Sequence, residues 1–339
     1  MGAKKILLVK LSSLGDVVHA LPVLQDIHAA LPDAQIDWVV EKSFAPLLAN
    51  HAGVHRIIAC EIRRWRKSPL SAATRLQWNA FKAQLRQERY DAVIDLQGLT
   101  KSALVARLAR MAPGGKRYAL ANQTEGSGYE APTRWVADVA IRMRPHIHAV
   151  QRSRELAAQA LGYALVVTPD FGLKRPAAQQ GRAQEAPENI ANRVAFVHGT
   201  SRADKEWPLD HWIALGQRLN AAGQQIVLPH GNARELATSQ AIAQALNARE
   251  PEQAVVWPLL ALDALTHELA LCAGVIGVDS GVSHIAVALD LPHVQIYNFD
   301  TDWRTGPAAG GRQRSVFAQP APSVEAVWQA WLDCQSGAA

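Results

Sequence analysis

Several short stretches of this 339-residue chain place acidic, basic or hydroxyl side chains beside glycine, where the backbone can turn and expose them. The stretch LSSLGDVVHALP, residues 11–22, puts Asp16 directly after a glycine, at the start of an expected helix. A carboxylate there either caps the helix or acts as a general base toward a bound hydroxyl. His19, one turn later, either packs in the core or tunes Asp16. Asp16 is the first candidate for chemistry.

The stretch GVDSGVSH, residues 277–284, predicts an anion site at the end of a strand. Asp279 ends the strand, Ser280 and Gly281 form a small-residue turn, and His284 lies in the following helix. Free N–H groups and the positive end of that helix dipole favour a phosphate, and glycine permits its close approach. The alternative is that Asp279 and Ser280 only cap the helix.

Two more expected strands end in polar groups. Thr200, Ser201 and Lys205 follow RVAFVHG, and hydroxyls with an ammonium suit a diphosphate. Glu235 follows QQIVLPHG and could accept both hydroxyls of a ribose. Taken singly, such a lysine or glutamate is usually just solvated. Because the carboxyl ends of parallel strands share one edge, the strand ends together predict a nucleotide site.

The segment IRRWRK, residues 62–67, groups four cations around Trp65, namely Arg63, Arg64, Arg66 and Lys67. Guanidinium groups bind phosphate or carboxylate through paired hydrogen bonds, so the segment is a candidate clamp for an anionic acceptor. A solvated loop is the alternative. Nucleic acid is not expected as a partner, because several aromatics do not interleave with these cations and no nucleic-acid-binding motif accompanies them.

The charge is unevenly distributed along the chain. Up to Leu165 there are 23 Lys and Arg against 13 Asp and Glu, and the remainder has 12 against 17. The basic half is therefore expected to meet the anionic partner, and composition alone leaves nucleic acid, a phosphorylated substrate and an acidic membrane surface open. The N-terminal apolar run, residues 6–9, is too short for a membrane span, and the three cysteines lack the spacing of a disulfide framework or zinc site. We expect a protein of the reducing cytosol.

Short apolar strands alternate with helices along both halves of the chain, which predicts parallel sheets covered on both faces. Expected helices include residues 16–30, 71–88, 101–110, 210–221 and 234–248. Expected strands are residues 5–11, 35–40, 56–59, 91–97, 116–120, 193–199, 224–231, 254–258 and 275–279, and residues 293–298 close the series. The fold class is α/β with two Rossmann-like doubly wound domains: residues 1–175, a linker at 176–191 without hydrophobic periodicity, and residues 192–321.

Five stretches together resemble the heptosyltransferases of glycosyltransferase family 9, which extend the inner core of bacterial lipopolysaccharide, and among them those that add the first heptose. They are KILLVKLSSLGDVVHALP, IRRWRK, DAVIDLQGLTKS, HGTSRADKEWP and VDSGVSHIAVALDLP. The resemblance implies a GT-B fold, with two Rossmann-like domains facing a central cleft. It implies inverting, metal-independent transfer of L-glycero-D-manno-heptose from ADP-heptose to the first Kdo of Kdo2-lipid A, without a cofactor.

The resemblance also implies roles for residues at matching positions. Asp16 would be the catalytic base, projecting into the cleft, and Leu260 would line the adenine pocket. The donor would be bound by Thr200, Ser201, Lys205, Glu235, Leu260, Asp279, Ser280, Gly281 and His284. The acceptor would be bound by Ser13, Arg63, Arg64, Arg66, Lys67, Gln97, Lys101 and Gln123. Residues 121–132 depart from the family pattern, because they are glycine-rich and acidic where a basic acceptor contact is expected.

The same resemblance places the enzyme in the cytoplasm, at the cytoplasmic face of the inner membrane, in transient contact with its anionic surface. The C-terminal helix, within residues 322–336, is expected to pack back on the first domain, with a membrane-surface role as the alternative. Asp300 and Asp302 resemble the DxD of metal-dependent transferases, but they follow the last expected strand, and no metal site is expected.

Three other functions stay open. A related heptosyltransferase would use another acceptor, such as one that receives the second heptose. A nucleotide-sugar-binding module would bind the donor without turnover. A dinucleotide oxidoreductase is disfavoured, because LSSLGD lacks the Gly-x-Gly-x-x-Gly fingerprint.

Overall fold

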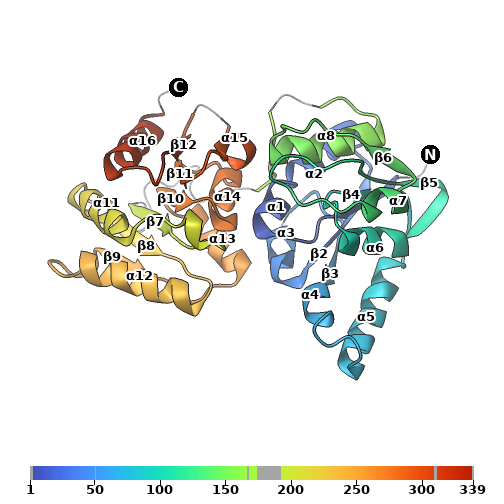
Figure 1. Ribbon diagram of the computed structural model, residues 1–339, viewed down its shortest axis with the longest axis horizontal. Helices are drawn as coiled ribbons and strands as arrows, with labels where there is room; N and C mark the ends of the chain where they lie inside the picture. The colour runs from blue at the N-terminus through green and yellow to red at the C-terminus, as the bar shows by residue number, and fades with distance from the viewer. Residues whose placement is uncertain (1–2, 50, 166–167, 174–191, 309–310, 338–339) are drawn as a thin grey trace. The chain divides into compact units, whose positions relative to one another are not determined.

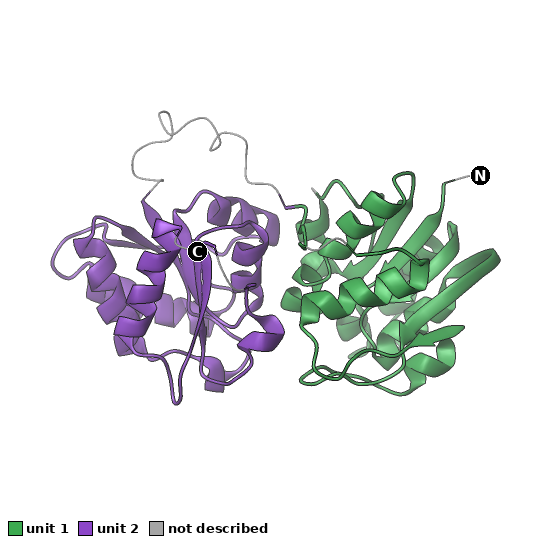
Figure 2. Cartoon of the chain, turned by 90° about the horizontal axis from the view of Figure 1, so that it is seen from above, with its two compact units in different colours: residues 1–172 green, residues 173–339 purple. Residues whose placement is uncertain are grey.

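The chain forms two compact units, residues 1–172 and 173–339, drawn in different colours in Figure 2. The structure is a computed structural model that describes residues 3–49, 51–165, 168–173, 192–308 and 311–337. Each unit holds one six-stranded sheet in which every strand pairing is parallel. The predicted fold class, α/β with two doubly wound parallel sheets, is confirmed. The expected linker, residues 176–191, lies outside the described residues.

The sheet of the first unit has the strand order β3-β2-β1-β4-β5-β6 (Figure 1). The order reverses between β1 and β4, and doubly wound sheets bind ligands at such a switch point, beyond the carboxyl ends of the strands. The strands are β1 Lys5–Val9, β2 Gln35–Glu41, β3 Arg56–Cys60, β4 Arg89–Asp95, β5 Arg110–Leu120 and β6 Val139–Ile141. The helices are α1 Leu14–Val18, α2 Pro22–Ala30, η1 Lys42–Phe44, α3 Ala45–Ala49, α4 Ile62–Trp65, α5 Ala72–Leu85, α6 Thr100–Leu108, α7 Pro132–Val136 and α8 Ala149–Leu161.

The second unit repeats this topology with the order β12-β11-β10-β7-β8-β9, so its switch point lies between β7 and β10. The strands are β7 Arg193–Val197, β8 Gln225–Leu228, β9 Ala254–Val256, β10 Gly274–Val278, β11 His293–Tyr297 and β12 Gln313–Phe317. The helices are η2 Ala203–Lys205, α11 Leu209–Ala221, α12 Ala233–Leu246, α13 Leu262–Ala270, α14 Gly281–Ala288, α15 Asp302–Thr305 and α16 Val324–Ser336. None of the described helices combines the length and the apolar character that crossing a membrane requires.

The strands near each switch point are apolar on both faces because helices cover both faces of the sheets. In β1 all four residues from Ile6 to Val9 are fully buried. Leu7 and Val9 pack in one cluster with Phe81 of α5 and Val105 of α6. Such continuous apolar strands are typical of covered parallel sheets, which is why the sequence pattern identifies them.

Local chemistry explains where the elements differ from the sequence prediction. The helix expected over residues 16–30 is two helices, and Pro22, which has no N–H to donate, is the first residue of α2. Strand β5 begins at Arg110 rather than Lys116, with an irregularity opposite Tyr90 and Ala92. The series of strands does not end with β11, as the sequence predicts, because β12 follows β11 and pairs with it along five residues.

The C-terminal helix belongs to the core of the second unit. Val327, Trp331 and Cys334 of α16 are buried in the cluster that also contains residues of β7, β10 and β11. The Trp331 indole N–H donates to Gln224 Oε1 at 3.2 Å. The apolar face of this helix therefore covers the sheet of its own unit, and the expected packing on the first domain stays a prediction.

Candidate functional site

Asp16 lies just beyond the carboxyl end of β1, in the first turn of α1. Its Oδ2 accepts hydrogen bonds from the backbone N–H and the hydroxyl of Ser13, both at 3.0 Å. Its Oδ1 lies 3.3 Å from the Lys10 ammonium and 4.0 Å from the Arg152 guanidinium. The helix-capping interpretation is thus correct, but the side chain remains 37% exposed and can still reach a ligand.

The surroundings of Asp16 keep it ionised. Burial favours the neutral acid, but the attraction of Lys10, the hydrogen bonds from Ser13 and the charge of Arg152 outweigh it and lower the pKa of Asp16 to about 2. At neutral pH the group is a carboxylate that can accept a proton. Lys10 is only 1% exposed, and burial lowers its pKa against the attraction of Asp16.

Gln97, which follows β4, and Lys101 of α6 hold the turn that carries Asp16. Gln97 is buried, and its Oε1 accepts hydrogen bonds from the backbone N–H groups of Leu11 and Ser12, at 3.0 and 3.1 Å. The Lys101 ammonium donates to the Ser12 hydroxyl at 2.9 Å. Ser13, Gln97 and Lys101, all predicted acceptor contacts, are therefore brought together with Asp16 at the β1–β4 switch point.

Sequence reasoning missed two cations of this site. Lys10 stood out in principle, since it is a charge at the end of an otherwise apolar strand. Arg152 has no local signal, because it reaches Asp16 from α8, far along the chain. It is buried and donates to the Thr124 hydroxyl at 3.0 Å, which ties the site to residues 121–132. Gln123 in that segment is exposed and donates to Ser127 O at 3.1 Å.

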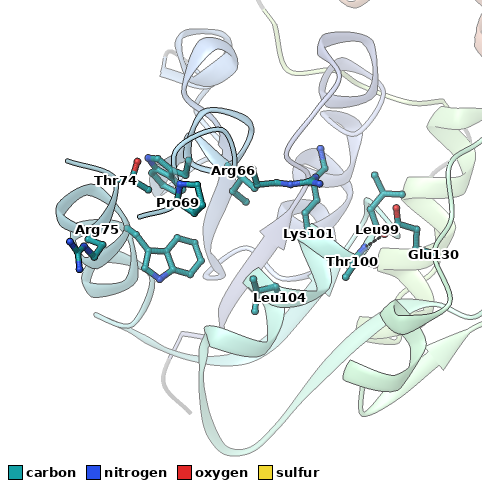
Figure 3. Close-up of a pocket in the computed structure, with 12 residues that line it drawn as sticks. Arg66, Pro69, Thr74, Arg75, Leu99, Thr100, Lys101, Leu104 and Glu130 are labelled. Carbon is teal, nitrogen blue, oxygen red and sulfur yellow. Dashed lines mark hydrogen bonds between the residues drawn. The ribbon is translucent and has the colours of Figure 1, made fainter. Parts of the chain in front are cut away.

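The predicted basic cluster lies in and just after α4, beside a cavity of about 830 Å³ drawn in Figure 3. The cations Arg63, Arg64, Arg66 and Lys67 are all exposed, whereas Trp65 is buried against Trp78 and Phe81. The cavity is lined by Ile62, Trp65, Arg66, Pro69, Thr74, Arg75, Trp78, Leu99, Thr100, Lys101, Leu104 and Glu130. It combines apolar walls with three cations, which suits an anionic ligand that also carries apolar surface.

The members of the basic cluster are not equivalent. Arg66 lines the cavity together with Lys101 of α6 (Figure 3). Arg64 instead pairs with Glu61 at 3.0 Å and also donates to Gln77. Burial and the charges of Arg63 and Arg66 lower the pKa of Lys101. Arg66 and Lys101, together with Arg75 of α5, are thus the cations that line this cavity.

In the second unit, Asp279 lies just beyond the end of β10 and is almost entirely buried. Its Oδ2 pairs with the Lys205 ammonium, and its Oδ1 lies 3.3 Å from His284 Nε2. The Thr200 hydroxyl donates to the backbone carbonyl of Asp279 at 3.4 Å. Burial disfavours the charge, but His284 and Lys205 hold the pKa of Asp279 well below its usual range. The predicted donor residues Thr200, Lys205, Asp279 and His284 therefore meet at the β7–β10 switch point.

Glu235 lies against the tip of β7. A Cβ on Gly199 would be 2.6 Å from the Glu235 carboxyl carbon, so the Glu235 side chain occupies space that the glycine leaves open. The carboxylate accepts hydrogen bonds from the Gly231 backbone N–H and from the Asn232 amide, both at 2.7 Å. Glu235 is therefore already oriented by the β8–α12 turn.

The remaining donor candidates lie at the same edge of the sheet or close to it. Ser280 is the N-cap of α14 and Gly281 is its first residue, so the capping interpretation is correct for Ser280. Ser201 is exposed after the tip of β7. Leu260 is half-buried after β9, and no described contact joins it to the Asp279 cluster.

Asp300 and Asp302 follow β11. Asp302 begins α15, and its carboxylate accepts a hydrogen bond from the Trp303 backbone N–H at 2.9 Å. Among the described residues, no group of three or more His, Cys, Asp or Glu side chains is arranged to hold a metal ion.

Sequence and structure comparisons identify relatives over most of the chain. The family model for glycosyltransferase family 9 (heptosyltransferase) matches residues 78–327. Lipopolysaccharide heptosyltransferase 1 of Escherichia coli K12 is 38% identical over 298 residues, covering 86% of this chain and 87% of that protein. Lipopolysaccharide heptosyltransferase 2 of the same strain is 27% identical, covering 86% and 82%.

Two solved structures of E. coli heptosyltransferase WaaC have the same fold, each 33% identical and covering 96% of this chain and 98% of theirs. The structure with ADP superposes with a TM-score of 0.82. The structure with ADP-2-deoxy-2-fluoro heptose superposes with a TM-score of 0.79.

Proposed function

The chain belongs to glycosyltransferase family 9, the heptosyltransferases, and on that premise we propose that it transfers L-glycero-D-manno-heptose from ADP-heptose to the first Kdo of Kdo2-lipid A. The higher identity to heptosyltransferase 1 than to heptosyltransferase 2 favours the first heptose over the second. A solved relative holding an ADP-heptose analogue supports the donor.

One observation carries the assignment of the reaction: Asp16 is an ionised, partly exposed carboxylate at a sheet switch point, and its turn is bonded through Ser12 to Lys101, a cation of the basic cavity. In the proposed inverting displacement, the acceptor hydroxyl attacks the anomeric carbon of the heptose while Asp16 takes the hydroxyl proton. The bond from the anomeric carbon to the diphosphate oxygen breaks, and ADP leaves with its electron pair. Because the pKa of Asp16 is low, proton transfer follows the start of bond formation, when the attacking oxygen has become acidic.

The second unit supplies groups suited to the leaving diphosphate. The Lys205 ammonium is positioned by Asp279, and the N-terminus of the eight-residue helix α14 begins at Gly281. An ammonium and free backbone N–H groups both stabilise charge that develops on a phosphate oxygen. We assign Thr200, Ser201, Ser280 and His284 to the same phosphate and sugar region, Glu235 to the ribose, and Leu260 to the adenine. The proposal invokes no metal ion.

The first unit supplies groups suited to the acidic acceptor. Arg66 and Lys101 would bind its anionic groups at the 830 Å³ cavity, with Arg63, Arg64 and Lys67 adding longer-range attraction. Ser13, Gln97 and Gln123 would contact or position the acceptor near Asp16. Because this acceptor is a lipid, we assign the protein to the cytoplasmic face of the inner membrane, in transient contact with its anionic surface.

The test is incubation of the purified protein with ADP-heptose and Kdo2-lipid A, with product measured by mass spectrometry. Asp16→Ala is expected to give almost no product while binding ADP-heptose as the parent does, whereas Asp33→Ala, at an exposed position of the same unit, serves as a matched control. Equal turnover by Asp16→Ala and the parent would remove Asp16 from its role. Product only on an acceptor that already carries one heptose would assign the chain to the second transfer, and binding without turnover would indicate a binding module.

A further inference from the structure

A second cavity of the first unit, of about 380 Å³, is lined mainly by arginines. It lies at the amino ends of β4 and β5, at the opposite edge of the sheet from Asp16, and its lining includes Arg86, Arg89, Arg107, Arg110 and Arg117. Guanidinium groups stay protonated at neutral pH. In the described part of the chain, only Arg117 among the five lies within 4 Å of a carboxylate, that of Asp138 at 3.7 Å. The cavity therefore concentrates positive charge.

The helix dipole and local hydrogen bonds explain why some of these arginines stand at the cavity, but not all of them. Arg86 follows the last residue of α5 and Arg107 lies in the last turn of α6, where the helix dipole favours a cation. Arg117 donates to the carbonyls of Ala106 and Ala109 at 3.1 and 3.2 Å, near the end of α6.

Arg89 has no such explanation. It is the register partner of Arg110, so two like charges occupy neighbouring positions on adjacent strands. Arg110 donates to the Arg86 carbonyl at 3.1 Å, which fixes one guanidinium at the cavity. Like charges this close repel each other, and a bound anion would turn that repulsion into attraction.

We propose that this arginine cavity binds a phosphate group or phosphate ester, at a site separate from the one proposed for heptose transfer. Paired guanidinium N–H groups match the oxygens of a phosphate, and several cations suit a dianion. The volume fits a small ligand. Arg86, Arg89 and Arg107 are exposed and contact the ligand, while the half-buried Arg110 and Arg117 line the cavity beside them. The phosphate belongs to a soluble compound or to a lipid headgroup, and the same groups recognise both.

The soluble arm of the test uses pyrophosphate as the probe and the full-length protein saturated with ADP, so that the proposed donor site is filled. Binding is measured by isothermal titration calorimetry at low salt. The double variant Arg89→Gln/Arg107→Gln is expected to lose at least about tenfold in affinity, since it loses two charge-assisted contacts. The control Arg134→Gln/Arg142→Gln removes the same charge at exposed positions of the same unit and is expected to bind as the parent does.

The lipid arm uses the same proteins in co-sedimentation with vesicles of phosphatidylglycerol and phosphatidylcholine, and with vesicles of phosphatidylcholine alone. Binding to the anionic vesicles that is lost in Arg89→Gln/Arg107→Gln, but kept in the control pair, assigns the site to a headgroup. Pyrophosphate binding with the same pattern assigns it to a soluble phosphate. No binding in either arm, or equal losses in the two double variants, overturns the proposal. Neither arm depends on turnover, so the outcome is independent of heptose transfer.

Discussion

The β1–β4 and β7–β10 switch points share one topology, but they expose opposite members of an aspartate–lysine pair. At the first, Lys10 is 1% exposed and Asp16 is 37% exposed. At the second, Asp279 is 7% exposed and Lys205 is 19% exposed. The carboxylate is therefore the accessible member in the first unit, and the ammonium is the more accessible member in the second.

This inversion matches the two halves of the proposed reaction. An accessible carboxylate can take a proton from a hydroxyl, and a partly accessible ammonium can bind a departing diphosphate. In each pair the buried partner orients the exposed one. The same fold can thus place opposite chemistry at equivalent positions by changing which residue of an ion pair is buried. Four variants test the comparison, in order of decreasing expected effect.

Asp16→Asn is expected to lower kcat by about 10²–10⁴-fold, because the amide cannot accept the proton. Its neutral side chain keeps the shape of the turn, so the affinity for ADP-heptose should stay unchanged. Steady-state kinetics with Kdo2-lipid A, combined with donor titration, separates the two effects. A loss of donor affinity without a loss of kcat would show that Asp16 is the binding member and would reverse the comparison.

Asp279→Asn is expected to act on stability and donor binding rather than on proton transfer. Losing the buried charge leaves Lys205 without its partner and should cost about 2–4 kcal/mol, which lowers the melting temperature by about 5–12 °C. Donor affinity should fall with it, because the ammonium is no longer held in place. Asp263→Asn, at an exposed position of α13, is the matched control, and equal melting curves for the two variants would contradict a structural role for Asp279.

The same variant should change how stability depends on pH. The pKa of Asp279 is lower in the folded protein than in the unfolded chain, so its contribution is present above the unfolded value of about 4 and is lost as the pH falls toward the folded value. Below pH 4, thermal melts of the parent should therefore converge with those of Asp279→Asn. A difference in melting temperature that stays constant from pH 7 to pH 3 would be inconsistent with this linkage.

Glu235→Gln is expected to weaken ADP-heptose binding by about tenfold, because a ribose hydroxyl would lose a charged acceptor. Its kcat should stay close to that of the parent, since Glu235 does not belong to either aspartate–lysine pair. Glu250→Gln, at an exposed position after α12, is the control. The measurement is donor titration by calorimetry, and an unchanged affinity would remove Glu235 from the donor site.

The smallest expected effect is a difference in acceptor KM between substitutions of two neighbouring arginines. Arg66→Gln should raise the acceptor KM by about three- to tenfold at low salt and less at high salt, because it removes a cation from the cavity. Arg64→Gln removes the same charge, but from a side chain paired with Glu61, and should change KM less. Equal effects of the two substitutions would indicate general attraction by the basic segment rather than contact in the cavity.

Much of the fold and part of the candidate site can be predicted from the sequence because their signals are local. Apolar runs such as residues 5–9 and 274–278 identify covered parallel strands, and the residue that follows each strand lies at the ligand-binding edge. Asp16, Thr200 and Asp279 are found in this way. Pro22 is also a local signal, since it is the first residue of α2, whereas α1 already ends at Val18.

Tertiary structure decided which of these groups act together. Three contacts join segments that are distant in sequence. Arg152 approaches Asp16, Gln97 supports the turn that carries Asp16, and α16 packs within its own unit. Even Lys10, visible as a charge beside an apolar strand, has no defined role until the turn brings Asp16 to it. Amino-acid order alone determined which side chains can carry charge or a proton. Folding determined which are buried, and therefore which pKa values shift and which groups can meet a ligand.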